Sequence, residues 1–358
     1  MRKRRTAVRR TAVRLTAACA VLTAASVLVM AGVAAGSAQA SVTYPVNWNV
    51  VTATAAGAAL NVPPPGANVP CTPSAAHPQP VVLLHGVFQN QNMAWQALAP
   101  TLANDGYCVY TMTYGQTLYS GNLGAIGDLS TSAAEVSTFV NHVLSSTGAA
   151  QIDLVGYSEG GYVARLYMKN YGSQHVKKYV GISPVNMEPA TISGILTVAY
   201  QIPGAAALVG VACPACEALS TQPAFTALNT PTATFPNVTY TDIATTSDEV
   251  ATPYPLSFLP AGPNVTNETV QSFCPDDTVG HLGMPTTEPP SSWHSTRLIR
   301  QTLSRCHAAR ASRSSGRLRG QVSRRISPAR RPGKTVSQHT TALTAPHPSR
   351  PPPPPAPT

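Results

Sequence analysis

The stretch "DLVGYSEGGYVARLY", residues 153–167, decides the fold. Its first residues end an apolar run typical of a buried strand, and its last residues have the spacing of a helix. Between them lies Gly-x-Ser-x-Gly, with Ser158 at the centre. A strand, a sharp turn and a helix in this order form a nucleophile elbow, in which glycines let the chain turn tightly. The sequence therefore predicts that Ser158 lies above a sheet edge, at a helix N-terminus that favours negative charge.

Strand patterns alternate with helix patterns on both sides of this elbow. Apolar or β-branched runs predict strands at 80–86, 107–115, 152–158, 176–184, 239–244 and 264–273. Helical spacing is found at 90–106, 130–148 and 160–172. This alternation predicts an α/β fold, with a mostly parallel sheet covered by helices on both faces. Open sheets of this kind bind ligands at the carboxyl ends of their strands, so His85-Gly86 and Ser158 should meet there.

A serine nucleophile needs a histidine base. In this fold the acid and then the histidine follow the serine along the chain. The downstream histidines are His175, His281, His294 and His307. His175 precedes a strand and so lies at the wrong edge of the sheet. We predict that His281, in the loop "CPDDTVGHLGMP", is the base, with His294 of a predicted final helix as the alternative.

The acid that orients the histidine has several candidates. Asp248 follows the predicted strand at 239–244 and is preferred. Asp242 lies within that strand, which indicates a structural role. Glu249 is adjacent to Asp248 and could replace it. Asp276 or Asp277, close to the histidine in sequence, could also orient it.

Two backbone N–H groups should stabilise the oxyanion. In this fold they come from the residue after the nucleophile and from the loop after the first strand. Those positions are Glu159 and Val87, with Phe88 as the fallback for Val87. Phe88 and Trp95 are candidates to line an acyl-binding site, although either could be an ordinary core residue.

The motifs "GYSEGG", "TTSDEVATPY" and "CPDDTVGHLG" resemble the secreted bacterial triacylglycerol lipases of the lipase class 2 group, within the α/β-hydrolase superfamily. The resemblance runs from about residue 80 to Cys306. It implies a lipid or other carboxylic ester as substrate and no cofactor. Glu159 departs from the group, where an amide or apolar residue is more usual. We expect its carboxylate to be turned away from the oxyanion site or hydrogen-bonded.

Six cysteines remain after Cys19 of the N-terminal segment, an even number that favours disulfides in an exported protein. Six cysteines allow fifteen pairings. The C-x-x-C at 213–216 has no second copy to complete a zinc site, so we expect a local bridge and no metal. The resemblance implies two further bonds, Cys71–Cys108 and Cys274–Cys306.

The two ends of the chain differ from its middle. Seven basic residues, an apolar run and Ala-Gln-Ala predict a secretory signal at 1–40, with a retained membrane anchor as the alternative. Residues 308–358 contain ten basic residues, no acidic residue and a proline run, which predicts a disordered tail. The remaining seven basic and all 14 acidic residues give the middle a net charge of −7. This charge argues against nucleic-acid binding by the folded part, and the tail could contact an anionic cell surface.

We therefore expect a monomeric secreted hydrolase, with the catalytic domain at 41–307 and an apolar cap or lid at about 186–235. A buried pair of helices is the alternative to a lid. A short-chain carboxylesterase, a polyester depolymerase or an acyltransferase could use the same residues. A catalytically inactive binding module is the rival from another class.

Overall fold

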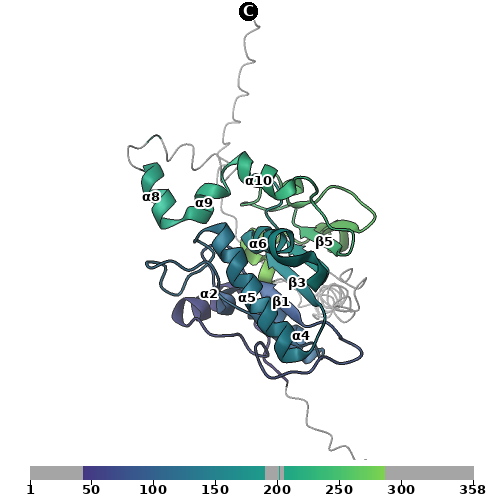
Figure 1. The fold of residues 1–358 in the computed structure, drawn as a ribbon. Coiled ribbons are helices and arrows are strands. Elements are labelled where there is room, and N and C mark those ends of the chain that lie inside the picture. Colours follow the sequence, from purple (N-terminus) through teal and green to yellow (C-terminus); the bar gives the residue numbers. More distant parts are fainter. Residues whose placement is uncertain (1–42, 190–200, 202–204, 287–358) are drawn as a thin grey trace, which may run out of the picture. The chain divides into compact units, whose positions relative to one another are not determined.

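The computed structural model of the protein describes residues 43–189, 201 and 205–286 (Figure 1). By its contacts the chain divides into Met1–Leu303 and Ser304–Thr358, and all described residues belong to the first unit. The described residues contain a six-stranded sheet in the order β2-β1-β3-β4-β5-β6, and every neighbouring pair is parallel. The strands are β1 (Val81–Leu84), β2 (Val109–Thr111), β3 (Ile152–Tyr157), β4 (Val176–Ile182), β5 (Thr239–Ala244) and β6 (Val265–Thr269).

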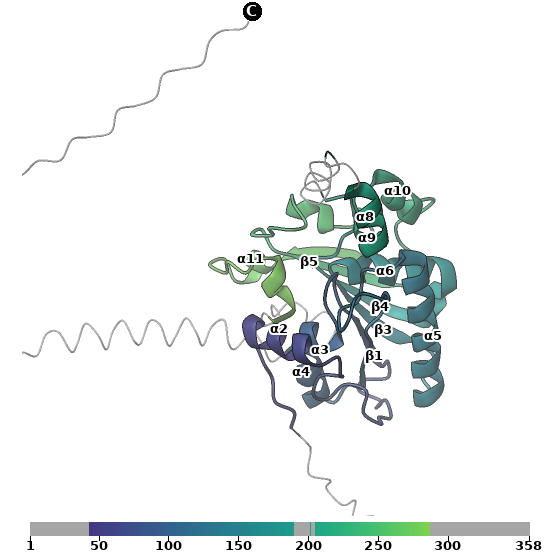
Figure 2. The ribbon, with the colours of Figure 1, turned by 90° about the vertical axis from the view of Figure 1, so that its left-hand side faces the viewer.

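Helices cover both faces of this sheet, which confirms the predicted α/β class. Figure 2 shows α5 on one face and α2, α3 and α4 on the opposite face. The α-helices are α2 (Val50–Ala59), α3 (Gln91–Ala94), α4 (Leu98–Asn104), α5 (Leu129–Thr147), α6 (Glu159–Tyr167), α8 (Ala205–Ala212), α9 (Pro214–Ala218), α10 (Gln222–Asn229) and α11 (Val270–Phe273). Shorter helical segments are Met168–Gly172, Ser173–His175, Tyr254–Ser257 and His281–Thr286.

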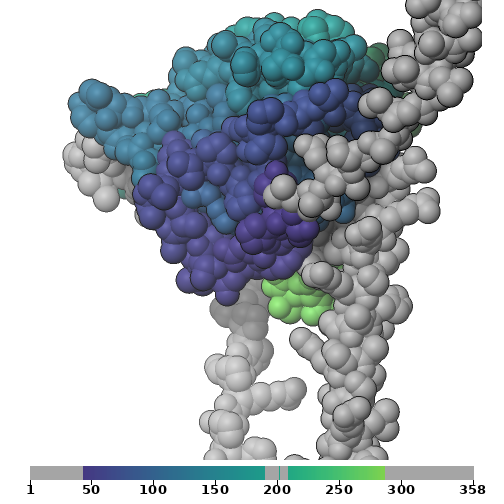
Figure 3. All heavy atoms as spheres, turned by 90° about the horizontal axis from the view of Figure 1, so that it is seen from below, coloured from purple at the N-terminus to yellow at the C-terminus, as the bar shows by residue number. Residues whose placement is uncertain are grey.

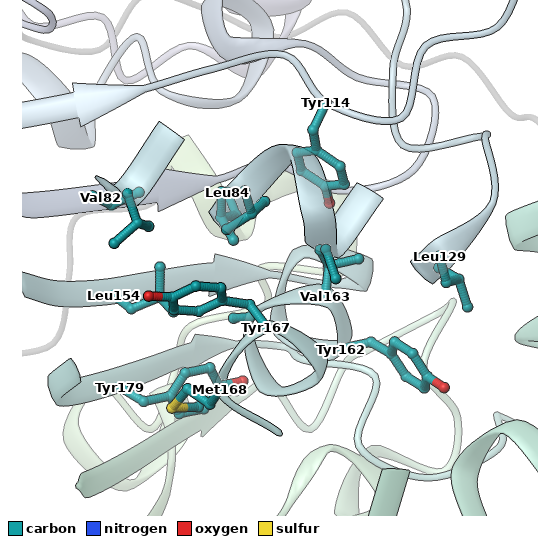
Figure 4. Packing of buried hydrophobic residues seen from close by; sticks show 14 of the residues in the cluster. Val82, Leu84, Tyr114, Leu129, Leu154, Tyr162, Val163, Tyr167, Met168 and Tyr179 are labelled. Carbon is teal, nitrogen blue, oxygen red and sulfur yellow. The ribbon is translucent and has the colours of Figure 1, made fainter. Parts of the chain in front are cut away.

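The apolar side chains of β1 pack on both faces of the sheet. Successive side chains of a strand point to opposite sides of the sheet. Val82 and Leu84 pack in the cluster that includes residues of α5 and α6, and Figure 4 shows both in this cluster. Val81 and Leu83 pack in the second cluster, with Trp95 and residues of α4. All four β1 side chains are fully buried, as expected for a parallel strand covered on both faces.

The predicted helix at 90–106 is interrupted. It forms as α3 and α4, which are separated by three residues starting at Trp95. Pro100 explains the break, because a proline inside a continuous helix lacks an N–H to donate and clashes with the preceding turn. In α4, Pro100 occupies the first turn, where N–H groups have no intrahelical acceptor.

The helix α5 begins at Leu129, one residue before the predicted helix at 130–148. The side chain of Asp128 caps the helix by accepting the backbone N–H of Thr131 at 2.7 Å. The predicted stop at Gly148 is confirmed. Gly148 has φ 69°, a left-handed conformation that glycine adopts without steric cost.

The segment predicted as a cap, residues 186–235, is partly within the described residues. Its described parts are tied to α6 by the buried side chain of Arg165. This guanidinium donates to Asn186 Oδ1 at 3.1 Å, to the carbonyl of Ala233 at 3.0 Å and to Asn229 of α10. The base of this segment is therefore fixed to the helix that follows Ser158.

Five of the described cysteines are disulfide-bonded. Cys71 is bonded to Cys108, which joins the segment before β1 to the start of β2. A second bond closes the C-x-x-C at 213–216. Cys274 is also disulfide-bonded, and its expected partner, Cys306, lies outside the described residues.

The predicted signal at 1–40 and the predicted tail at 308–358 also lie outside the described residues. Within the part of the chain that the structure describes, no helix has both the length and the apolar character needed to span a bilayer.

Candidate active site

Ser158 occupies the sharp turn between β3 and α6. Its backbone has φ 54° and ψ −122°, a conformation that side chains rarely adopt. The flanking glycines are required by close packing. A Cβ on Gly156 would lie 2.5 Å from the carbonyl oxygen of Gly160, and a Cβ on Gly160 would lie 2.2 Å from the carbonyl oxygen of Leu84. The elbow is therefore pressed against β1, and only glycine leaves room for it.

The end of β1 lies beside this serine because of the strand order. The chain runs from β1 outward to β2 and then crosses to β3 on the other side of β1. This reversal between β1 and β3 is the switch point at which open α/β sheets bind ligands. A Cβ on Gly86 would lie 3.1 Å from Ser158 Cβ, so the loop after β1 passes next to the serine.

Three polar side chains converge at this point. His281 Nε2 lies 2.9 Å from Ser158 Oγ, and His281 Nδ1 lies 2.9 Å from Asp248 Oδ2. All three residues are buried. Asp248 comes from the loop after β5, and His281 begins the 3-10 helix that follows α11 and its loop. The structure thus brings together the serine, histidine and aspartate preferred from the sequence.

The environment of Asp248 determines which nitrogen of His281 carries a proton. Burial raises the pKa of Asp248, but the hydrogen bond and charge of His281 lower it. Its Oδ1 also accepts the backbone N–H groups of Val250 at 2.9 Å and Ala251 at 2.6 Å, and the net pKa is below its usual value. An ionised carboxylate only accepts hydrogen bonds, so Nδ1–H donates to it. In neutral His281, Nε2 is then free to accept the proton of Ser158.

The other acids expected near this site have different partners. Asp242 is fully buried within β5 and accepts Asn186 Nδ2 at 2.9 Å and the N–H of Leu259 at 3.0 Å. Burial raises its pKa to about 7. Asp277 accepts the N–H of Val279 at 2.8 Å. Neither carboxylate is bonded to the imidazole of His281.

Glu249 binds the backbone of the histidine loop instead of the imidazole. Its Oε2 accepts the N–H of His281 at 2.7 Å, and its Oε1 accepts the N–H of Leu282 at 3.2 Å. Among the other candidate bases, His175 lies at the amino end of β4, and His294 and His307 are outside the described residues.

The loop after β1 is held by His85, whose role is not evident from the sequence. Burial lowers the pKa of His85 to about 4, with a smaller opposing effect of its hydrogen bond to Gly86, so the ring is neutral near pH 7. Its Nδ1 lies 2.9 Å from the carbonyl oxygen of Gly86 and must donate to it. The hydroxyl of Tyr114 donates to the carbonyl of His85 at 2.6 Å, and the two rings stack.

This hydrogen bond orients the peptide between Gly86 and Val87. In a trans peptide the N–H points away from the preceding carbonyl, so fixing the Gly86 oxygen also fixes the direction of the Val87 N–H. Within the described residues, the Val87 N–H has no hydrogen-bond acceptor. Glu159 is the first residue of α6, where an N–H has no intrahelical acceptor. Val87 follows Gly86, which packs next to Ser158, and Glu159 follows Ser158 itself in the chain.

Glu159 was expected to be turned away from the oxyanion site or hydrogen-bonded, and the second alternative is not found in the described part of the chain. The side chain is fully buried, and neither carboxylate oxygen has a hydrogen-bond partner in the described part of the chain. Burial raises the pKa of Glu159 well above its ordinary value. Burial therefore favours the neutral acid, which places no negative charge beside the serine.

The two candidate substrate contacts lie in different environments. Phe88 has φ 56° in the loop after β1 and is 50% exposed. Trp95 is fully buried in the core cluster on the α4 face, where it packs with residues of β1. The structure thus gives Trp95 a packing role and leaves Phe88 accessible beside Val87.

The 3-10 helix that carries His281 contacts α2 from the N-terminal part of the chain. Seen from below, purple N-terminal residues border the light-green C-terminal part of the described chain (Figure 3). No group of three or more His, Cys, Asp or Glu residues within the described ranges has a geometry that could hold a metal ion.

The chain was compared with curated protein sequences and with solved structures. No curated protein sequence is significantly similar to the chain. Among solved structures, a lipase B from Aspergillus fumigatus is 16% identical, with a TM-score of 0.47, over 60% of this chain and 52% of that one. The lipase BlEst2 of Bacillus licheniformis in its mature form is 16% identical, with a TM-score of 0.45, over 63% of this chain and 94% of that one. The chain spans about half the length of the Aspergillus lipase.

A model of one protein family also matches the chain. The match covers residues 78–254, from just before β1 to the loop that carries Asp248, and its description is Lipase (class 2). It includes the serine elbow and the aspartate described above. Residues 78–254 therefore match the lipase (class 2) family of carboxylic ester hydrolases, and this part of the chain carries the elbow of the α/β-hydrolase fold.

Proposed function

We propose that the protein is a secreted serine hydrolase that cleaves carboxylic esters of lipids through Ser158, His281 and Asp248. The observation that carries this proposal is the pair of 2.9 Å contacts that link the three side chains at the elbow. A serine hydroxyl is a weak nucleophile, and a neutral imidazole within hydrogen-bonding distance can remove its proton as it attacks.

The first half of the reaction acylates the serine. Ser158 Oγ bonds to the ester carbonyl carbon as its proton moves to His281 Nε2, and the carbonyl oxygen becomes an oxyanion. The N–H groups of Val87 and Glu159 stabilise that charge. When the carbonyl reforms, the bond to the alcohol oxygen breaks, and the alcohol leaves with the proton from Nε2.

The second half releases the acid. Water replaces the alcohol, gives its proton to His281 Nε2 and bonds to the acyl carbon. Collapse of the second oxyanion returns the proton to Ser158 Oγ and frees the fatty acid. Asp248 remains ionised throughout, holding Nδ1–H and stabilising the imidazolium. The residues themselves provide every proton transfer, so no cofactor is required.

Apolar surface beside the site supports a lipid ester as substrate. Phe88 follows Val87 in sequence and is 50% exposed, and Leu282 follows His281 and is 60% exposed. An acyl chain could bury part of this surface, which favours binding by the hydrophobic effect.

Export is proposed from the predicted signal at 1–40 together with the disulfides, since disulfides persist in oxidising compartments. The basic residues at 308–358 would then hold the exported protein at an anionic cell surface. Deletion of residues 308–358 should leave turnover unchanged and release the protein from cells at low salt. Full-length protein that is equally soluble in the presence of cells would contradict this role of the tail.

The chain length of the substrate separates the enzymatic alternatives. Initial rates of the purified protein should be measured on p-nitrophenyl esters of two to eighteen carbons and on emulsified triacylglycerol, with Ser158→Ala as control. A lipase retains activity on long chains and on the emulsion, whereas a short-chain carboxylesterase loses it. An acyltransferase forms new esters when an alcohol is added. If neither wild type nor Ser158→Ala turned over any ester, the binding-module alternative would replace the proposal.

A further inference from the structure

Glu249 connects the loop that carries Asp248 to the start of the 3-10 helix that carries His281. Each carboxylate oxygen accepts a different backbone N–H, from His281 at 2.7 Å and from Leu282 at 3.2 Å. N–H groups in the first turn of a helix lack intrahelical acceptors, so these two require a partner. A single side chain provides both.

The contact leaves no free space at the histidine loop. A Cβ on Gly280 would lie 2.2 Å from Glu249 Oε2, so the carboxylate packs directly on the backbone before His281. Any other residue at position 280 would push the carboxylate off the loop. The sequence feature that permits the contact is therefore Gly280, the residue before His281.

The backbone of His281 is held from a second side as well. The hydroxyl of Tyr157, the last residue of β3, donates to the carbonyl of His281 at 3.0 Å. Glu249 thus holds the N–H and Tyr157 the C=O of the same residue. Tyr157 immediately precedes Ser158. Its contact therefore fixes the position of His281 relative to the elbow.

We propose that Glu249 is a positioning residue, which holds the backbone of His281 so that its imidazole stays between Ser158 and Asp248. This inference rests on the proposed function of the Ser158 site. The dipeptide Asp248-Glu249 then has two tasks, since Asp248 holds the ring and Glu249 holds the backbone.

The charge of Glu249 acts on the same site. Burial, and then the negative charges of Asp248 and Glu249, raise the pKa of Tyr157, so the field of Glu249 reaches the hydroxyl that contacts His281. A second negative charge near the imidazole stabilises its protonated form. Removal of that charge should therefore shift the acidic limb of the activity profile, whereas loss of a purely mechanical contact would not.

The test compares Glu249→Gln with Asp277→Asn. Each variant loses one negative charge from the loops around His281. An amide has one oxygen and an NH₂ group, so Glu249→Gln can accept only one of the two N–H groups. Asp277 accepts the N–H of Val279 through one oxygen, Oδ1, which asparagine retains, so Asp277→Asn keeps its bond. Rates are normalised to the serine sites that a fluorophosphonate labels at completion, so that unfolded molecules do not count.

We expect kcat of Glu249→Gln to fall about tenfold with KM within about twofold of wild type, because small misplacements of a catalytic group are costly. The acidic limb of its kcat/KM profile should move to lower pH. Glu249→Asp keeps the charge on a shorter side chain, so its kcat should fall while its acidic limb stays in place. Asp277→Asn leaves the contacts of the His281 backbone in place, so its kcat should stay at the wild-type value.

Equal kcat values and pH profiles in Glu249→Gln and Asp277→Asn would overturn the positioning role. That result differs from failure of the proposed function. If the function is wrong, wild-type protein lacks ester turnover, or Ser158→Ala retains it, whatever residue occupies position 249.

Discussion

His281 Nε2 and Ser158 Oγ lie 2.9 Å apart although 123 residues separate them in the chain. Their proximity follows from the parallel sheet, because the ends of β3, β5 and β6 face the same edge. The loops that follow these strands therefore carry the serine, the aspartate and the histidine to one place.

Replacement of Asp248 by asparagine should abolish most of the activity. The amide can donate to Nδ1, which would place the ring proton on Nε2, facing Ser158, where it blocks proton transfer. We expect kcat for ester hydrolysis to fall about 10⁴-fold with little change in KM. A stopped-time assay with a chromogenic ester measures this loss. A decrease of less than tenfold would show that another acid orients His281.

Glu159 should make stability depend on pH. Its folded-state pKa is raised above the ordinary value of 4.5, so the folded protein holds this proton more tightly than the unfolded chain does. The stabilisation is complete below pH 4.5 and is lost as the pH rises toward the folded-state pKa. Relative to wild type, Glu159→Gln should therefore gain free energy of unfolding as the pH rises above 4.5.

Urea unfolding at several pH values measures that difference. Glu217→Gln, an exposed substitution on α9, is the control and should follow wild type at every pH. Activity should persist in Glu159→Gln, because the proposed oxyanion donor is a backbone N–H. Curves for wild type and Glu159→Gln that stay parallel with pH would mean that the buried group is ionised in the folded protein.

Replacement of Gly160 and of Gly148 by alanine should cost different amounts of stability, because close packing requires the first glycine and backbone conformation favours the second. A Cβ on Gly160 meets the carbonyl oxygen of Leu84 at 2.2 Å, within the rigid contact between α6 and β1. A Cβ on Gly148 meets nothing within 4 Å, and only its φ of 69° disfavours alanine. Gly148→Ala should cost about 1 kcal/mol of stability, and Gly160→Ala about 3 kcal/mol or more. Similar unfolding midpoints for the two variants would contradict the close contact at Gly160.

The two described disulfides close loops of different length. Cys71 and Cys108 are 37 residues apart, whereas Cys213 and Cys216 are three apart. Loss of loop-closure entropy predicts that replacing the first pair with serine costs about 4 kcal/mol, and the second pair about 2 kcal/mol. Thermal unfolding of the two double variants measures the order. A larger loss from the short loop would indicate that it stabilises the folded state by contacts.

Local patterns in the sequence were sufficient for most of the sheet. The apolar run predicted as a strand at 80–86 forms a strand at Val81–Leu84. The β-rich segment Thr239–Ala244 forms a strand with the predicted bounds. The elbow at Ser158 was predictable because its glycines, strand and helix are adjacent in sequence. The break before Leu98 was missed, although Pro100 is visible in the sequence, because the apolar spacing continues through it.

Long-range contacts account for what the sequence did not reveal. Glu249 was considered only as a replacement acid, since its adjacency to Asp248 says nothing about a backbone 32 residues away. His85 stood out at the end of a strand, but its hydrogen bond to Gly86 depends on the local turn. The full burial of Glu159 depends on the helix and strand packing around it. Each of these roles is set by tertiary structure.

Covalent labelling tests the central claim most directly. Purified protein should be treated with a fluorophosphonate while ester hydrolysis is followed, and the adduct located by peptide mass spectrometry. We predict one adduct, on Ser158, that forms in parallel with loss of activity and is absent from Ser158→Ala. Full ester hydrolysis by Ser158→Ala, or loss of activity through an adduct on another residue, would contradict this account.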